Sequence, residues 1–228
     1  MGDDALELTH FHGRARLFPL PNFVMFPHVL KPLLIFEARY RQLTEDALAS
    51  DHLLALVLLR PHTPEEYLGN PPIHDTACLC RILNSQRLSD GRFNILVRGL
   101  CRLRIEAEIP SPKLYRIVQG RLLPDGPTPD DPYIYDSLAH QVRHFLPLGG
   151  QALGQIEELL AQRPPLGALL DILAFVLPLE PERKQQLLDL TDVTTRAQTL
   201  LHLLEESLPP VLPAPRERLV FPPKFSIN

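Results

Sequence analysis

Residues 17–40 have the sequence LFPLPNFVMFPHVLKPLLIFEARY, in which four prolines separate short apolar runs. Proline lacks a backbone N–H and its ring clashes with the preceding helical turn, so such runs do not form helices. We therefore predict strands or extended segments at residues 17–20, 24–26 and 33–36. Their close spacing is typical of a β-rich module.

The same β pattern continues after this stretch, with one helix inserted into it. Residues 53–59 are uniformly apolar, which indicates a strand covered on both faces, although periodicity alone also permits a buried helix. Residues 37–50 place Tyr40, Leu43 and Ala47 on one helical stripe with charges elsewhere. We expect that helix to pack against the sheet.

A hairpin is the clearest local motif of this half. Asp90-Gly91 separates two strand-like runs and supplies the positive φ values that a tight hairpin turn requires. In residues 101–108, small or apolar residues alternate with charged ones. One face of that strand should be buried and the other exposed to water.

A change of composition divides the chain. The stretch from residue 124 to residue 132 is rich in Pro and Asp, and neither packs nor continues regular structure. Apolar residues then recur at helical spacing, with Asp131 and Asp192 as candidate N-caps. The predicted divisions are an N-terminal extension (1–13), a β-rich module (14–123), a linker (124–132), a helical bundle (133–208) and a Pro-rich tail (209–228).

Composition limits the class of protein. The chain has 228 residues, 45% of them hydrophobic, and a net charge of −4, which argues against coating of nucleic acid or an anionic membrane surface. Three cysteines suit a reducing compartment, and the acidic N-terminus lacks the features of a signal peptide. We expect a cytoplasmic protein that does not enter the membrane.

Taken together, these motifs resemble the N-terminal, substrate-recognition domain of Lon proteases. The resemblance implies an α+β fold, in which a PUA-like β pseudo-barrel is followed by a C-terminal helical bundle. A Lon protease also carries a phosphate-binding Gly-x-x-x-x-Gly-Lys-Ser/Thr loop and a Ser-Lys peptidase, and this sequence has no such loop. The matching stretches are residues 17–20, 24–28, 32–33, 36–37, 39–40, 77–82, 90–99, 102–105, 169–179, 182–185, 187–189, 196 and 200–206.

The family likeness implies a non-catalytic module that binds exposed hydrophobic or disordered polypeptide. Such a protein would serve protein quality control, alone or as an adaptor for a separate protease. An apolar groove between the modules, helped by an open sheet edge, is the expected binding surface. Phe23 and Met25 are the candidate contact residues, because they lie near the Pro21-Asn22 turn. Four other aromatic residues are expected in the core: Phe18, Phe26, Phe36 and Tyr40.

The alternative hypothesis is RNA binding by a basic sheet face. Residues 81–121 contain nine Lys or Arg against three Asp or Glu, a local charge of +6. Arg98, Arg102 and Arg104 are the candidate phosphate-binding residues of that face. Few aromatic residues interleave with them, although base stacking normally requires such residues. Nucleic acid is therefore the less favoured partner.

Metal and catalytic chemistry are weakly indicated. His140 and His144 have the i, i+4 spacing of zinc ligands, but no third ligand or adjacent Glu completes a known zinc motif. The cysteines, Cys78, Cys80 and Cys101, are interpreted as core residues. Ser111 and Lys113 lie in a Pro-flanked turn without an oxyanion motif. We predict no metal, no cofactor and no enzymatic activity.

Overall fold

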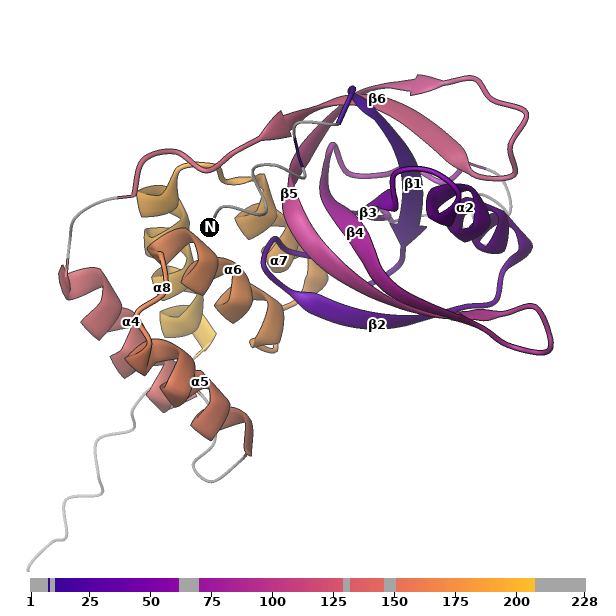
Figure 1. The fold of residues 1–228 in the computed structure, drawn as a ribbon. Coiled ribbons are helices and arrows are strands. Elements are labelled where there is room, and N and C mark those ends of the chain that lie inside the picture. The colour runs from indigo at the N-terminus through magenta and orange to yellow at the C-terminus, as the bar shows by residue number, and fades with distance from the viewer. Residues whose placement is uncertain (1–7, 9–10, 62–69, 129–131, 146–150, 208–228) are drawn as a thin grey trace, which may run out of the picture.

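A closed β barrel forms the N-terminal half of the computed structural model, which describes residues 8, 11–61, 70–128, 132–145 and 151–207 (Figure 1). Its sheet has the order β2-β5-β4-β3-β1-β6, and β6 also pairs with β5, which closes the ring. Strands β1 and β3 are parallel, and the other pairs are antiparallel. The strands are β1 (Arg14–Leu20), β2 (Leu30–Ile35), β3 (Leu53–Leu58), β4 (Thr76–Arg87), β5 (Phe93–Ile109) and β6 (Arg116–Leu123).

Strand β3 lies between β1 and β4 in the barrel wall and is buried at every position, which confirms the prediction for this run. Leu54 and Leu56 pack on one side with Tyr40 and other residues of helix α2 (Ala38–Leu48). Ala55 belongs to a second apolar cluster on the other side. The predicted helix is thus confirmed, and its Tyr40 ring stacks on Phe18 at a centroid distance of 4.0 Å.

The segment between β1 and β2 is irregular, so residues 24–26, for which a strand or an extended segment was predicted, do not form a strand. It is held on β5 at Gly99, whose N–H donates to Val29 O at 2.9 Å and whose carbonyl accepts from His28 N at 2.9 Å. A Cβ atom on Gly99 would lie 2.0 Å from the carbonyl oxygen of Phe26. Only glycine allows the two backbones to approach this closely.

The predicted hairpin joins β4 to β5. Gly91 has a φ of +81°, and the Leu88 N–H donates to Arg92 O at 2.8 Å. The long strand β5 then continues beyond it. Its first half pairs with β2 and its second half with β6, so one strand serves both ends of the barrel.

Helices pack into a second lobe beside the barrel (Figure 1). Their core consists of the leucine stripes predicted from the sequence, and Leu169, Leu173 and Leu200 are fully buried. Asp192 caps the last helix, because its carboxylate accepts from Thr195 N at 2.7 Å. The helices are α4 (Pro132–Phe145), α5 (Gln151–Ala161), α6 (Leu166–Val176), α7 (Pro181–Asp189) and α8 (Val193–Ser207).

Two further expectations fall on segments that are not described: the capping role of Asp131 and the course of the tail from residue 209 onward. No described helix is both long enough and apolar enough to cross a lipid bilayer. The described elements therefore place a barrel and a helical bundle side by side, and the candidate sites lie on or between them.

Candidate functional site

Strand β2 has an open edge. Among the described residues it pairs only with β5. Because Gly99 donates to Val29 O and antiparallel hydrogen bonding alternates from there, Leu30, Pro32 and Leu34 direct their backbone polar groups away from β5. Pro32 has no N–H, so the middle of this edge offers a carbonyl oxygen but no donor.

Exposed apolar side chains follow the same strand. Leu30 is 55% exposed, Leu34 is 48% exposed, and Phe36, just after β2, is 63% exposed. We call Leu30, Pro32, Leu34 and Phe36 the edge row. The expectation that Phe36 belongs to the core is wrong. Strand alternation gives the inward position to Ile35 and leaves Phe36 on the other side as the chain turns into α2.

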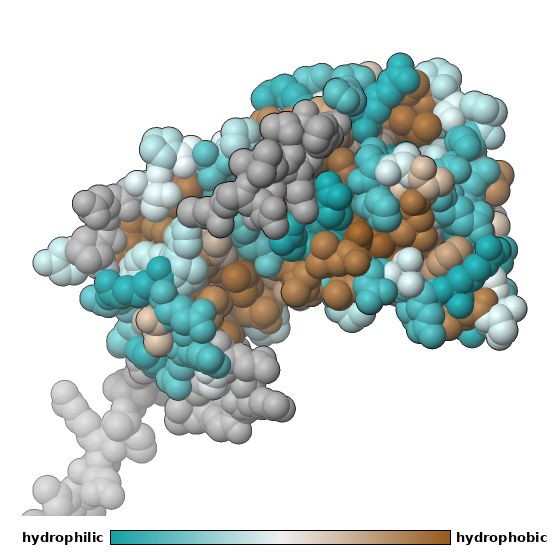
Figure 2. Space-filling model, viewed as in Figure 1, coloured by the Kyte–Doolittle hydropathy of each residue, from teal (hydrophilic) through white to brown (hydrophobic). Residues whose placement is uncertain are grey.

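A second apolar surface lies where the barrel meets the helices, and we call its residues, Phe23, Lys31, Phe175, Val176 and Lys184, the seam surface. The half-buried Phe23 ring meets the Phe175 ring of α6 edge to face, with centroids 6.1 Å apart. Val176 is 46% exposed. Figure 2 shows apolar surface that extends from the helical lobe onto the adjoining side of the barrel.

Of the two predicted polypeptide-binding residues, only Phe23 reaches this surface. Met25 is 1% exposed and packs in the core, so the expectation that it is exposed is wrong. The irregular segment at residues 24–26 turns its side chains inward against the barrel instead of presenting them on a strand. A contact between Met25 and a ligand would therefore require unfolding of the segment.

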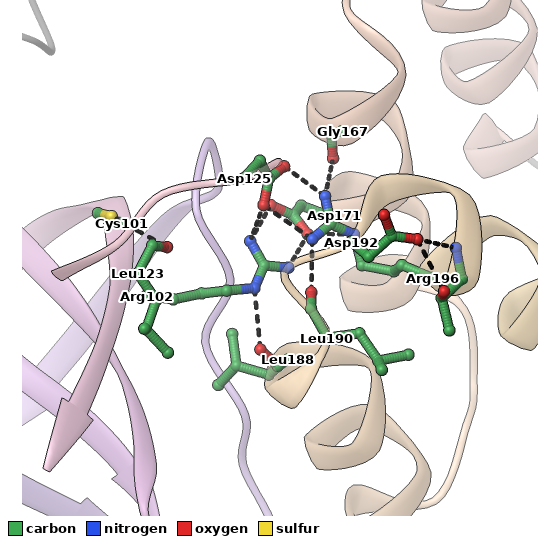
Figure 3. A network of polar contacts seen from close by, with 11 residues as sticks. Cys101, Arg102, Leu123, Asp125, Gly167, Asp171, Leu188, Leu190, Asp192 and Arg196 are labelled. Atoms are coloured by element: carbon green, nitrogen blue, oxygen red, sulfur yellow. Dashed lines mark hydrogen bonds and ion pairs between the residues drawn. The ribbon is translucent and has the colours of Figure 1, made fainter. Parts of the chain in front are cut away.

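A buried polar network joins the barrel to the bundle (Figure 3). Arg102 of β5, which is 2% exposed, donates to Asp171 of α6 at 2.5 and 3.1 Å and to Asp125 of the linker at 3.1 Å. Its Nε also donates to Leu188 O at 2.8 Å. One arginine side chain thus connects the barrel, the linker and two helices.

The second arginine of the network is Arg196 of α8, which is also fully buried. It pairs with Asp125, lies 3.5 Å from Asp171 and donates to Leu190 O at 2.8 Å. Burial alone lowers the pKa of Arg102, but the charges of Asp171 and Asp125 outweigh that effect and leave the pKa raised. Burial raises the pKa of Asp171, although both arginines oppose that rise. We call Arg102, Asp125, Asp171 and Arg196 the junction network.

The junction network was missed in the sequence, although one signal was present. The apolar stripe of α6 contains a single carboxylate, Asp171, and a lone charge on a buried helix face needs a partner. Asp125 was assigned to a linker that does not pack. Instead it holds both arginines, so this part of the linker is anchored.

The three arginines proposed for RNA binding do not form one surface. Arg102 is buried in the junction network, because the helical lobe covers the face of β5 that was expected to be wet. Arg104 is exposed and pairs with Asp75 at 3.3 Å. Arg98 is half-buried and lies opposite Leu30 of the edge row. The basic residues are therefore dispersed among structural and surface roles.

Two pockets formed by the described residues each lie within a single module. A pocket of about 350 Å³ at one end of the barrel is lined by Arg14, Pro110 and Tyr115, among others. Another, of about 380 Å³, lies between α4 and α5 beside Tyr135 and His140. Neither includes a residue of the edge row or the seam surface. The groove expected between the modules is not among these pockets and is not confirmed; the described residues form an exposed apolar surface there instead.

The remaining candidate residues that are described lie in the core or in loops. Cys78, Cys80 and Cys101 are buried, free thiols. Ser111 lies in the loop between β5 and β6, and the nearby Lys113 pairs with Asp46 at 2.8 Å. Within the described residues no group of three His, Cys, Asp or Glu side chains is placed to hold a metal ion. The side chain of His144 lies outside the described set.

Comparison with known proteins assigns this combination of barrel and bundle to a family. A family model described as the ATP-dependent protease La (LON) substrate-binding domain matches residues 14–206. The chain therefore belongs to the LON substrate-binding domain family. The match concerns this domain, and neither an ATPase nor a peptidase domain is part of it.

Curated relatives are Lon proteases. The Lon protease of Rhizobium meliloti (strain 1021) is 25% identical over 194 residues, which cover 83% of this chain and 23% of the relative. The Lon protease of Escherichia coli (strain K12) is 24% identical over 198 residues, with 84% and 24% covered. The chain spans about a quarter of the length of these relatives.

Solved structures of two Lon N-terminal domains share the fold. The domain from Mycobacterium avium complex has a TM-score of 0.65 at 18% identity, covering 86% of this chain and 100% of that one. The Lon N-terminal domain protein from Xanthomonas campestris has a TM-score of 0.59 at 22% identity, covering 83% and 97%. This likeness confirms the predicted α+β class.

Proposed function

We propose that this chain is a non-catalytic polypeptide-binding module that takes up exposed hydrophobic or disordered protein segments along β2. The observation that carries the proposal is that a strand edge left unpaired by the described residues coincides with exposed apolar side chains in the edge row. Large exposed apolar patches mark binding sites in soluble proteins. The substrate-binding description of the family points the same way.

Binding by strand addition accounts for both the edge of β2 and the exposed apolar side chains of the edge row. An extended segment beside β2 would receive backbone hydrogen bonds at Leu30 and Leu34 and would cover their side chains. Burial of the exposed half of each leucine contributes about 1 kcal/mol. Backbone pairing is independent of sequence, so one edge can accept many unfolded chains that offer apolar side chains.

We further propose a role in protein quality control, in which the module holds an unfolded client alone or delivers it to a separate protease. The full-length relatives are named as proteases, whereas this chain matches their substrate-binding part. The module itself should hydrolyse neither ATP nor peptide bonds. We place this role in the cytoplasm, because three buried, unpaired thiols suit a reducing compartment.

The test is binding of a permanently unfolded protein, such as fluorescently labelled, reduced and carboxymethylated α-lactalbumin, followed by anisotropy. The variant Leu30→Ser/Leu34→Ser/Phe36→Ser should weaken binding about tenfold or more. Leu114→Ser is the matched control, because Leu114 is 62% exposed in the loop between β5 and β6. Equal binding by both variants would refute the edge row as the site.

Salt dependence separates this function from RNA binding. Apolar capture should change little between low and moderate salt, whereas binding to phosphates weakens steeply. A single-stranded RNA of mixed sequence serves as the comparison ligand. Tight, salt-sensitive RNA binding without capture of the unfolded protein would favour the alternative.

A further inference from the structure

Two lysines converge on one aromatic ring of the seam surface. The Nζ atom of Lys31, on β2, lies 5.9 Å from the centroid of Phe175 and 5.7 Å from that of Phe23. The Nζ atom of Lys184, on α7, lies 5.7 Å from the Phe175 centroid. Strand and helix thus bring two positive charges to the same apolar site from distant parts of the sequence.

Neither lysine has a carboxylate partner among the described residues. Lys184 Nζ donates to the carbonyl oxygen of Phe175 at 2.6 Å, and burial lowers the pKa of this half-buried amine. The acidic side chains of α7 are engaged elsewhere: Glu182 pairs with His74, and Asp189 accepts from Gln185. Burial of an ammonium group without a nearby negative charge disfavours its charged form, and a carboxylate placed beside it would offset that cost.

The position of Lys31 on β2 relates this charge to the open edge. Side chains alternate along a strand, so Lys31 projects on the face opposite to Leu30 and Pro32. An added strand would alternate in the same way. One of its residues would lie beside Lys31 and the aromatic pair, and the residues before and after it would lie on the side of the edge row.

We propose that the preferred ligand of this surface is an extended segment in which an acidic residue is flanked by apolar residues. This inference rests on the proposed function and adds a charge preference to it. The carboxylate would lie between Lys31 and Lys184, and the flanking side chains would lie beside Leu30 and Pro32 of the edge row. An internal acidic side chain supplies the carboxylate, so no free chain end is required.

Three peptides test the proposal. They are acetylated and amidated, share the same alternating apolar and serine residues, and differ only in a central Glu, Gln or Lys. The Glu peptide should bind about three- to tenfold more tightly than the Gln peptide, and the Lys peptide more weakly than both. The preference should diminish as salt is raised, because the lysines are partly exposed to solvent.

The matched variants assign the preference to its residues. Lys31→Gln/Lys184→Gln should bind the Glu and Gln peptides equally, while Lys113→Gln, which removes a lysine that pairs with Asp46, should retain the preference. Thermal unfolding establishes that the variants are folded. If the double variant is not, the half-exposed Lys31→Gln alone should halve or further reduce the preference.

The outcomes separate the inference from the function beneath it. Equal affinity of the wild-type protein for the Glu and Gln peptides would overturn the charge preference and leave the apolar function standing. A preference that survives in the lysine variant would also overturn it. Failure of all three peptides and of the unfolded protein to bind would remove the proposed function itself.

Discussion

The junction network and the edge row differ in how completely their groups are satisfied. Four charged side chains of the junction network are matched by opposite charges and backbone carbonyls, and three of these four side chains are almost fully shielded from water. The edge row has the opposite character: apolar side chains face solvent, and backbone groups point to an edge that pairs with no other described strand.

The difference teaches which surface holds the molecule together and which is available to a ligand. Buried charges are costly to uncover, so a network of this kind fixes the two lobes against each other. Solvent-exposed leucines contribute little to the folded state. Mutations in the two regions should therefore affect different measurements.

The largest effect is expected from breaking the junction network. Asp171→Asn removes the charge that two buried arginines share, and we expect the free energy of unfolding to fall by about 3–5 kcal/mol. Urea denaturation measures the change. The control is Asp136→Asn, which removes the exposed carboxylate of the ion pair with Arg163. It should lower the free energy of unfolding by less than about 0.5 kcal/mol. Similar values for the two variants would contradict the contrast.

Variants of Met25 and Phe23 distinguish a core residue from a residue of the seam surface. Met25→Ala should lower the free energy of unfolding by about 3 kcal/mol, because it leaves a cavity in the core. Phe23→Ala should lower the free energy of unfolding less than Met25→Ala does, since Phe23 is only half-buried. It should lower the affinity for unfolded protein more than Met25→Ala does. Loss of binding by a fully stable Met25→Ala would restore that residue to the site.

Thiol reactivity of Cys101 reports whether the barrel opens. Burial raises the pKa of Cys101 from 9.0 to about 11. At pH 8 its thiolate fraction is then about 100-fold lower in the folded protein than in the unfolded chain. We expect iodoacetamide to label it correspondingly more slowly, as followed by mass spectrometry. Asp171→Asn should leave this rate unchanged, because the apolar cluster that holds Cys101 contains no residue of the helical lobe. Faster labelling in this variant would show that the network also stabilises the barrel.

The smallest change in stability is expected at the edge. Leu34→Ser should alter the free energy of unfolding by less than about 0.5 kcal/mol, because the side chain is already half-exposed. Its affinity for carboxymethylated α-lactalbumin should nevertheless fall several-fold. A large loss of stability instead would mean that Leu34 is a structural residue, and the edge would then resemble the junction.

Local signals were sufficient for most elements of the fold. The helix that contains Tyr40 and Leu43, the Asp90-Gly91 hairpin and the Asp192 cap each depend on neighbouring residues and could be predicted from the sequence. The stretch between β1 and β2 was harder, because its path depends on the close approach to Gly99 on a strand far along the chain.

The errors at Arg102 and Phe36 share one physical cause, which is that burial of a strand face depends on what packs over it. Alternation correctly separates Arg102 from Leu103 on β5 but cannot show that the helical lobe covers Arg102. It likewise could not show that Phe36 faces solvent. The convergence of Lys31 and Lys184 on Phe175 joins residues of three elements, and no local pattern encodes it.

Pro32 carries a consequence for self-assembly. An exposed strand edge that binds unfolded chains can also pair with identical copies of the protein. Amyloid fibres grow through uninterrupted backbone hydrogen bonding between such strands. The missing donor in the middle of β2 removes one hydrogen bond from any ladder that a copy of the chain could form along this edge. Proline on an exposed edge strand is a feature that weakens such association between copies.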